Sequence, residues 1–385
     1  MKSMANNRIL ILWTAAFKTP RLTKQARTLA DQGYSVDILY WNRGIDEEDN
    51  KIKAKKIKKE IGGNIYEIKT RRSLYGRGVF NFYPRGCYII KVFIFLVRNG
   101  KKYSVIHAID FDSAFPVFLY KFFNKKIKFV YDIADFIESY SSPIPNFIRR
   151  IIRILDKKIM KRANAIILPD ENRIQNIPLH LRHKVYIVNN APDINLEKIK
   201  KISKTISLKN PNKINLIYYG AFSRDRGIKI LLESAEKTKD KIDFYFAGWG
   251  NLEWLIKKYS KKLSNVFYLG LLNQDKVLSY LSLMDISYIV YSPAYEHNRL
   301  ASPNKLFEAI ILGKPVIVAK GTSIDKIVKN HNLGYIIKYE KEDLLNVLQN
   351  LRKKTLNRKI GAVRKIFGWE ESKKVLINLY NKLSI

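Results

Sequence analysis

The stretch that decides the fold is SPNKLFEAIILGKPVIV, residues 302–318. Ser302 is a favourable N-cap, and Pro303 suits the first turn of a helix because it has no N–H to leave unpaired. Gly313 is typical of a helix end, and the apolar residues 315–318 indicate a short buried strand. We therefore expect a helix whose N-terminus, with its free N–H groups and the positive end of its dipole, can bind an anion.

This helix separates an apolar face from a polar one, since successive residues turn by about 100°. The apolar face consists of Leu306, Phe307 and Ile310. The polar face consists of Asn304, Lys305 and Glu308. A cation and a carboxylate one turn apart suit a ligand that carries both phosphate and hydroxyl groups. An ordinary surface pair, worth roughly a few tenths of a kcal/mol, has the same spacing, so the stretch alone leaves both interpretations open.

Composition indicates anionic partners. The 385 residues include 71 Lys and Arg against 34 Asp and Glu, a formal net charge of +37, which fits nucleic acid, anionic lipid or phosphorylated substrates. Cys87 is the single cysteine, so one chain cannot form a disulfide framework or a cysteine-based metal site. The most apolar run, residues 88–97, is too short to span a bilayer and is interrupted by Lys91. We expect a cytosolic protein that can touch a membrane.

Strands and helices alternate along the chain. Residues 9–13 and 36–40 predict strands on either side of a helix at 21–33, a βαβ opening typical of a parallel α/β domain. Further strands are expected at 103–107, 129–132, 165–168, 185–188, 214–219, 244–247, 267–270 and 285–290. The polar residues Asn189 and Asn190, followed by Ala-Pro, indicate a linker. The chain is therefore predicted to form two α/β domains with their boundary at this linker.

Several of these segments resemble the GT-B glycosyltransferases called family 4 or group 1, and they follow that family's order along the chain. The resemblance is strongest at residues 302–318. It implies the GT-B fold, in which two Rossmann-like domains with parallel sheets face a central cleft. Residues 1–190 would be the acceptor domain, 191–368 the nucleotide-sugar donor domain, and 369–385 a helix that crosses back to the first domain.

The resemblance also implies a donor site in the second domain. The family's carboxylate at the position of Glu308 holds the nucleotide ribose, while the helix start at Ser302, Pro303 and Asn304 faces the diphosphate. The family's second glutamate, eight residues earlier, is replaced by Leu300, which puts the usual contact to the donor sugar in question. The remaining residues expected to bind the donor are Gly220, Arg224, Arg226, Gly270 and Lys305.

In the first domain, the resemblance assigns His107 to the donor sugar once the cleft closes. Asp110, in the loop after the same strand, would be its partner, and Glu308 completes the expected catalytic set. Asp110-Phe111-Asp112 also mimics a metal-binding Asp-x-Asp, but GT-B enzymes need no metal, and we expect neither metal nor cofactor. Arg21 is a candidate contact for an anionic acceptor, or else a solvated arginine in the first turn of a helix.

The reaction implied is transfer of a sugar from a nucleotide-sugar donor, with retention of configuration, to a glycan or a polyprenyl-phosphate-linked acceptor in surface polysaccharide synthesis. A lysine run such as 51–59 is usually a solvated face, and an apolar helix such as 88–97 is by default a core helix. In the other interpretation the run attracts anionic lipid and the helix dips into an interface, which indicates a peripheral position on the inner face of the cell membrane. Two alternatives remain. One is a GT-B epimerase or non-catalytic binder of nucleotide sugars, and the other is a basic nucleic-acid-binding protein, for which no known module is found.

Overall fold

The computed structural model describes residues 7–14, 20–45, 47–73, 82–136, 146–192, 194–356 and 361–383. The chain divides into two compact units. Unit 1 comprises Met1–Asn189 with Glu370–Ile385, and unit 2 comprises Asn190–Trp369. The boundaries expected from the sequence, 190/191 and 368/369, each lie one residue from these. Among the described residues, no helix combines the length and the apolar character that crossing a bilayer requires.

Unit 1 is built on a seven-stranded sheet in the order β3-β2-β1-β4-β5-β6-β7, in which every pair is parallel. Its strands are β1 (Arg8–Trp13), β2 (Ser35–Asn42), β3 (Ile65–Lys69), β4 (Val105–Ile109), β5 (Lys128–Asp132), β6 (Ala165–Leu168) and β7 (Val185–Ile187). The central strands are buried on both faces, which explains their continuous apolar runs.

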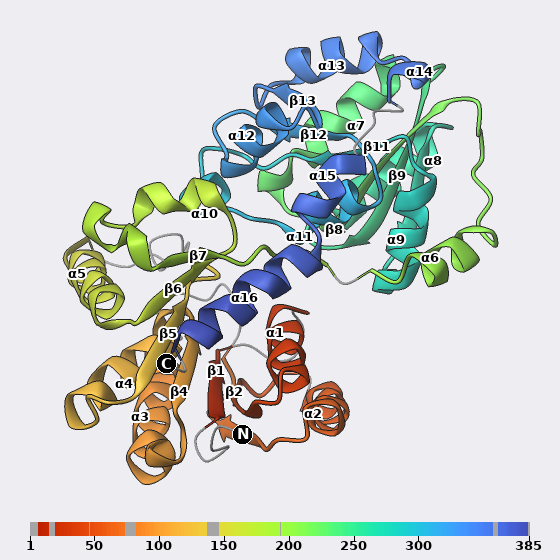
Figure 1. Ribbon diagram of the computed structural model, residues 1–385. Helices are drawn as coiled ribbons and strands as arrows, with labels where there is room; N and C mark the ends of the chain where they lie inside the picture. Colours follow the sequence, from red (N-terminus) through yellow and green to blue (C-terminus); the bar gives the residue numbers. More distant parts are fainter. Residues whose placement is uncertain are drawn as a thin grey trace. The chain divides into compact units, whose positions relative to one another are not determined.

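Helices cover both faces of this sheet (Figure 1). They are α1 (Pro20–Asp31), α2 (Glu47–Ile61), α3 (Phe82–Asn99), α4 (Asp110–Phe123), α5 (Asn146–Arg162) and, at the end of the chain, α16 (Trp369–Leu383). Helices α1 and α2 contact each other, and α3, α4 and α5 form a second layer, with α4 between α3 and α5. Right-handed crossovers place these two layers on opposite faces, because the strand order reverses after β3.

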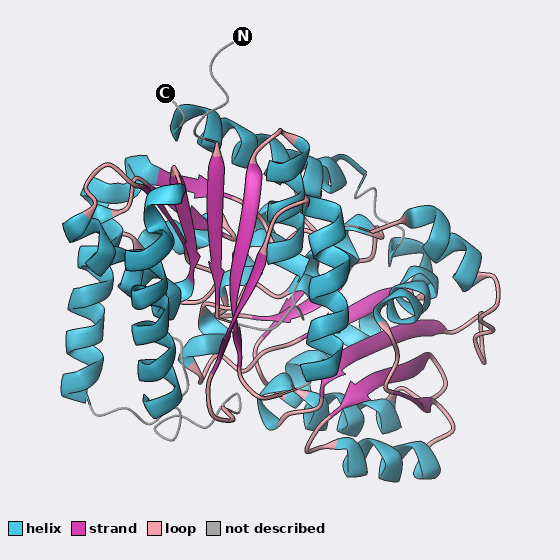
Figure 2. Cartoon of the chain, turned by 90° about the horizontal axis from the view of Figure 1, so that it is seen from below, coloured by secondary structure: helices cyan, strands magenta, loops and turns pink. Residues whose placement is uncertain are grey.

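Unit 2 repeats the plan with a parallel six-stranded sheet in the order β10-β9-β8-β11-β12-β13. Figure 2 shows the strands of the chain in magenta with the helices packed around them in cyan. Its strands are β8 (Ile214–Ala221), β9 (Ile242–Trp249), β10 (Val266–Gly270), β11 (Ile286–Ile289), β12 (Val316–Ala319) and β13 (Gly334–Ile337). Its helices are α6 (Leu196–Ser203), α7 (Ile228–Lys237), α8 (Glu253–Lys262), α9 (Gln274–Leu283), α10 (Glu296–Arg299), α11 (Asn304–Ile311), α12 (Ser323–Asn330), α13 (Lys341–Asn350), α14 (Lys353–Leu356) and α15 (Gly361–Ile366).

The helix predicted from residues 302–318 is α11, but its start differs from the prediction. Pro303, with φ −73° and ψ 135°, is the N-cap, so Ser302 lies outside the helix and makes no cap hydrogen bond. The shift lies in Pro303 itself, because its extended ψ keeps it out of the helix and makes Asn304 the first helical residue. The end is as expected, since Gly313 adopts a left-handed conformation (φ 71°) directly after the helix.

Candidate functional site

The end of β8 forms the floor of the predicted donor site. Strand alternation sends Tyr218 into the core beneath α7 and α8 and Tyr219 into the core beneath α6 and α9. Gly220 follows with φ 105°, a conformation that other residues rarely adopt. A Cβ on Gly220 would lie 2.7 Å from the Lys305 Nζ, so the glycine leaves room for that ammonium group.

Glu308 is buried and held at the floor of this site. It is 6% exposed, and its Oε2 accepts a 2.7 Å hydrogen bond from the Tyr219 hydroxyl. Its Oε1 lies 3.5 Å from the Gln274 amide nitrogen, which donates to it from α9. A buried carboxylate needs such partners. The interpretation of Lys305 and Glu308 as an ordinary surface pair is therefore wrong.

Lys305, one turn before Glu308, points its ammonium at the same two tyrosines. Nζ lies 4.6 Å from the centre of the Tyr218 ring and 5.4 Å from that of Tyr219. Burial, reinforced by the neighbouring charge of Arg226, lowers the pKa of Lys305 to about 7. An anion bound beside this group would reverse that effect and favour the charged lysine.

Arg226 is the second cation of the site. It ends a short 3₁₀ turn, Arg224–Arg226, after β8, and its guanidinium stacks 4.0 Å from the centre of the Tyr291 ring. Nη1 donates to the Asn298 Oδ1 at 3.2 Å, while Asn298 Nδ2 donates to Asp225 Oδ2 at 3.0 Å. Asn298 is fully buried, so α10 fixes the position of the guanidinium.

The start of α11 adds backbone N–H groups without a side-chain cap. Just before it, the Ser302 hydroxyl is buried and has no hydrogen-bond partner among the described residues, while the Ser302 carbonyl accepts from Asn190 Nδ2 at 3.1 Å. Pro303 and Asn304 continue the chain into the helix. The predicted residues Gly220, Arg226, Lys305 and Glu308 thus lie around one point at the carboxyl end of β8.

Three other predicted features lie beside this group rather than in it. Arg224 is exposed, and only its carbonyl has a described partner, the Tyr339 hydroxyl at 3.2 Å. Gly270 ends β10 with φ 71° and has open space where a side chain would stand. Leu300, at the position of the expected second glutamate, follows α10 and is half-buried.

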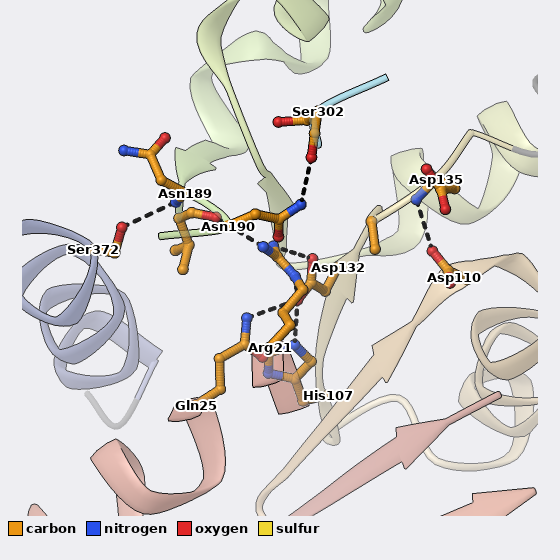
Figure 3. A network of polar contacts seen from close by, with 12 residues as sticks. Arg21, Gln25, His107, Asp110, Asp132, Asp135, Asn189, Asn190, Ser302 and Ser372 are labelled. Atoms are coloured by element: carbon orange, nitrogen blue, oxygen red, sulfur yellow. Dashed lines mark hydrogen bonds and ion pairs between the residues drawn. The ribbon is translucent and has the colours of Figure 1, made fainter. Parts of the chain in front are cut away.

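In unit 1, His107 is a fully buried residue of β4 (Figure 3). Its Nδ1 lies 2.8 Å from the Tyr380 hydroxyl of α16, and its Nε2 lies 3.3 Å from Asp132 Oδ2. The expected pairing of His107 with Asp110 is wrong. Parallel pairing of β4 with β5 places Asp132 beside the end of β4, whereas Asp110 accepts a hydrogen bond from the backbone N–H of Asp135 at 3.0 Å.

Arg21 also belongs to this network. It is 5% exposed, and its Nη2 and Nε donate to the two oxygens of Asp132 at 2.7 and 3.0 Å, while Nη1 donates to the Val188 carbonyl (Figure 3). Burial opposes ionisation of Asp132, but Arg21, together with His107, lowers its pKa below the ordinary value. Arg21 is therefore neither solvated nor turned outward to meet an acceptor, and the structure gives it the role of a partner to Asp132.

Asp110 has two unusual properties. Its φ of 63° is rare for a residue other than glycine, and such strain often accompanies functional sites. Burial, together with the nearby charge of Asp135, raises the pKa of Asp110 well above its usual range. Asp112 points elsewhere, to Arg85 at 3.5 Å, and among the described residues no three His, Cys, Asp or Glu side chains are placed to hold a metal ion.

The sequence of the chain is similar to a family of glycosyltransferases. Residues 199–379 match the family model described as "Glycosyl transferases group 1". The match lies mainly in unit 2 and covers just under half of the chain. A curated relative, TuaH of Bacillus subtilis, is a proposed glycosyltransferase of teichuronic acid biosynthesis. It is 25% identical over 215 residues, which cover 54% of this chain and 54% of TuaH, so the chain spans about half the length of that relative.

Solved structures confirm the GT-B fold of the chain. HepE from Anabaena, crystallised with UDP, is 15% identical and superposes with a TM-score of 0.68, covering 97% of this chain and 100% of HepE. The UDP-GlcNAc 2-epimerase of Neisseria meningitidis, bound to UDP-GlcNAc, is 15% identical with a TM-score of 0.62, over 97% of this chain and 100% of the epimerase. At this identity both likenesses show the fold alone.

Proposed function

We propose that this chain is a glycosyltransferase that takes a sugar from a nucleoside-diphosphate donor in unit 2. The observation that carries the proposal is the grouping of Lys305, Arg226 and Glu308 around Gly220 at the carboxyl end of β8. Ligands of parallel α/β sheets gather at that edge. The family match and the UDP-bound state of HepE support a nucleotide sugar as the ligand.

The chemistry assigned to these residues follows from charge. When the bond from the anomeric carbon to the diphosphate breaks, the leaving diphosphate gains negative charge. Lys305, Arg226 and the uncapped start of α11 place fixed positive charge and N–H donors where that charge develops. The buried carboxylate of Glu308 accepts hydrogen bonds from the ribose hydroxyls, which orients the nucleotide for this step.

The finer parts of the proposal concern the acceptor and the stereochemistry. In it the sugar is transferred with retention and without a metal ion to a glycan or lipid-linked acceptor of a surface polysaccharide, on the inner face of the membrane. The teichuronic acid role proposed for TuaH supports such an acceptor. In unit 1, the raised pKa of Asp110 suits a carboxyl group that donates a proton.

The test is turnover with a panel of sugar nucleotides and a membrane extract as the source of acceptor. We expect nucleoside diphosphate to be released only when acceptor is present. The sugar should be recovered in lipid or glycan with the anomeric configuration that it had in the donor. Proton NMR of the anomeric centre reads the configuration. Inverted product would refute retention, and release that is unaffected by EDTA would support independence from metal.

A second candidate is epimerisation of a nucleotide sugar, favoured by Leu300 in place of the second glutamate and by the shared fold of the Neisseria epimerase. The same panel separates the two functions. An epimerase converts the nucleotide sugar to its epimer without any acceptor and transfers nothing to lipid or glycan.

A further inference from the structure

The outward faces of three neighbouring helices in unit 1 are apolar. Helices α3, α4 and α5 lie side by side on one face of the seven-stranded sheet (Figure 1). Among the described residues, 18 large hydrophobic side chains are exposed, and ten of them belong to these three helices. The outward side of a helix in an α/β domain is ordinarily polar. The face of this layer, which we call the α3–α5 face, is therefore unusual for a surface exposed to water.

On α5 the apolar residues form a stripe. Phe147, Ile151 and Ile154, spaced four and three residues apart, are 66%, 52% and 47% exposed. The opposite side of the helix carries the buried Ile159 and Met160. Exposed basic residues in or beside the stripe are Arg150, Lys157, Lys158 and Lys161. This arrangement is that of a helix lying in the plane of a membrane interface.

Helix α3 repeats the pattern. Its inner side is buried through Tyr88, Val92 and Leu96. Its outer stripe consists of Tyr83, Ile90, Ile94 and Val97, which are 65%, 60%, 43% and 54% exposed. The exposed Lys91 and Arg98 stand beside it. The helix is thus neither wholly in the core nor wholly outside it, because only its inner half packs on the sheet.

The end of α4 joins the two stripes into one surface. Phe123, 78% exposed, packs with its ring centre 6.1 Å from that of Phe93 on α3. Phe122, 53% exposed, lies under the guanidinium of Arg162 at the end of α5, at 4.1 Å. Apolar surface bordered by cations therefore continues across all three helices.

The lysine run 51–59 belongs to α2, which covers the other face of the sheet (Figure 1). Because α2 and α3 lie on opposite faces of the sheet, the lysines of α2 and the apolar stripe of α3 cannot contact the same flat bilayer. In the sequence, both segments are candidate signs of membrane contact. Helix α2 carries a single exposed large hydrophobic side chain, Ile52. Of these two faces, as far as the described residues show, the α3–α5 face alone combines an apolar stripe with cations.

We propose that the α3–α5 face docks on a lipid bilayer with anionic headgroups. The apolar side chains enter the interface, and the lysines and arginines beside them meet the headgroups. A second copy of the chain is a poorer occupant, because both faces would carry the same positive charge. Nucleic acid would leave the isoleucines without a partner. The inference deepens the proposed function by naming the surface that reaches a lipid-linked acceptor, but its grounds are independent of the donor site.

The test measures flotation of the full chain with vesicles of phosphatidylcholine and phosphatidylglycerol, compared with phosphatidylcholine alone. Ile90→Ser removes an isoleucine of the stripe that is 60% exposed, and Ile52→Ser removes a control isoleucine on α2 that is 64% exposed. We expect Ile90→Ser to weaken vesicle affinity several-fold and Ile52→Ser to leave it unchanged. Combining Ile90→Ser, Ile94→Ser and Ile151→Ser should weaken it by about 100-fold. Unchanged thermal unfolding of each variant checks that the fold is intact.

Three results would overturn the proposal. The first is that Ile90→Ser and Ile52→Ser change vesicle affinity equally. The second is that the chain binds vesicles with and without phosphatidylglycerol equally well, and the third is that the wild-type chain does not float with vesicles. If light scattering instead shows a dimer that Ile90→Ser dissociates, the face is an interface between copies. Nucleotide affinity, measured on the same variants, should not change. Flotation without nucleotide binding would refute the proposed function alone, and nucleotide binding without flotation would refute only the docking surface.

Discussion

Replacement of Glu308 by glutamine should abolish the ability of the protein to distinguish ribose from deoxyribose. The carboxylate is 6% exposed and accepts hydrogen bonds from Tyr219 at 2.7 Å and from Gln274 at 3.5 Å. Each carboxylate oxygen can accept more than one hydrogen bond, and in the proposed site Glu308 also accepts from the ribose hydroxyls. A hydrogen bond to a charged group contributes about 1.5–3 kcal/mol, which corresponds to roughly a 10- to 100-fold change in affinity. In Glu308→Gln the amide oxygen can still accept from Tyr219, and an NH₂ group then faces the ribose.

The assay is isothermal titration calorimetry with the nucleoside diphosphate that binds most tightly and with its 2′-deoxy and 3′-deoxy analogues. Wild type should bind at least one deoxy analogue about 10- to 100-fold more weakly than the parent. Glu308→Gln should bind the parent and that analogue equally, at the weaker value. Glu233→Gln makes the same chemical change on α7 in the same unit and should behave as wild type. Undiminished discrimination in Glu308→Gln would refute the assignment of Glu308 to the ribose.

Three further predictions concern the same two networks. Nucleotide affinity should fall as pH rises above about 7, by up to about tenfold per unit, because the bound diphosphate requires the charged form of Lys305, whose pKa is lowered to about 7 in the free protein. Lys305→Arg should remove this dependence, since a guanidinium stays charged, and a pH series of titrations checks both. Gly220→Ala should weaken nucleotide binding as much as Lys305→Ala, because its Cβ would displace Nζ. Equal affinity for Gly220→Ala and wild type would contradict that contact. Tyr380→Phe should destabilise the fold by about 1–3 kcal/mol in urea titration, since it leaves the buried His107 nitrogen unpaired, and an unchanged midpoint would contradict the bond.

Local patterns were sufficient to predict most of the fold. The apolar runs of β1, β4 and β5 are buried on both faces, so composition alone marks them as strands of a parallel sheet. Edge strands β3 and β13 were missed, because they are only partly buried and carry a mixed pattern. The start of α11 was placed one residue too early, since Pro303 is compatible with a first helical position by its φ but adopts an extended ψ and becomes the N-cap.

The site in unit 2 could be predicted because a contiguous motif carries much of it. Lys305 and Glu308 are three residues apart on one helix, whereas the partner of Glu308, Tyr219, lies 89 residues away on β8 and has no local signal. The network around His107 in unit 1 depends on one neighbouring strand, 25 residues away, and on one helix 273 residues away. Proximity in sequence favoured Asp110 as the partner of His107, but strand register brings Asp132, and Tyr380 arrives from 273 residues away.

The central claim is that unit 2 binds a nucleoside diphosphate through Arg226, Lys305 and Glu308. Its most direct test is a calorimetric titration of wild type, Arg226→Ala and Glu308→Ala with a panel of nucleoside diphosphates and their sugar esters. We predict that at least one nucleotide binds the wild type and that both variants lose about 10-fold or more in affinity for it. Absence of binding across the whole panel, or variants that bind as tightly as wild type, would contradict the claim.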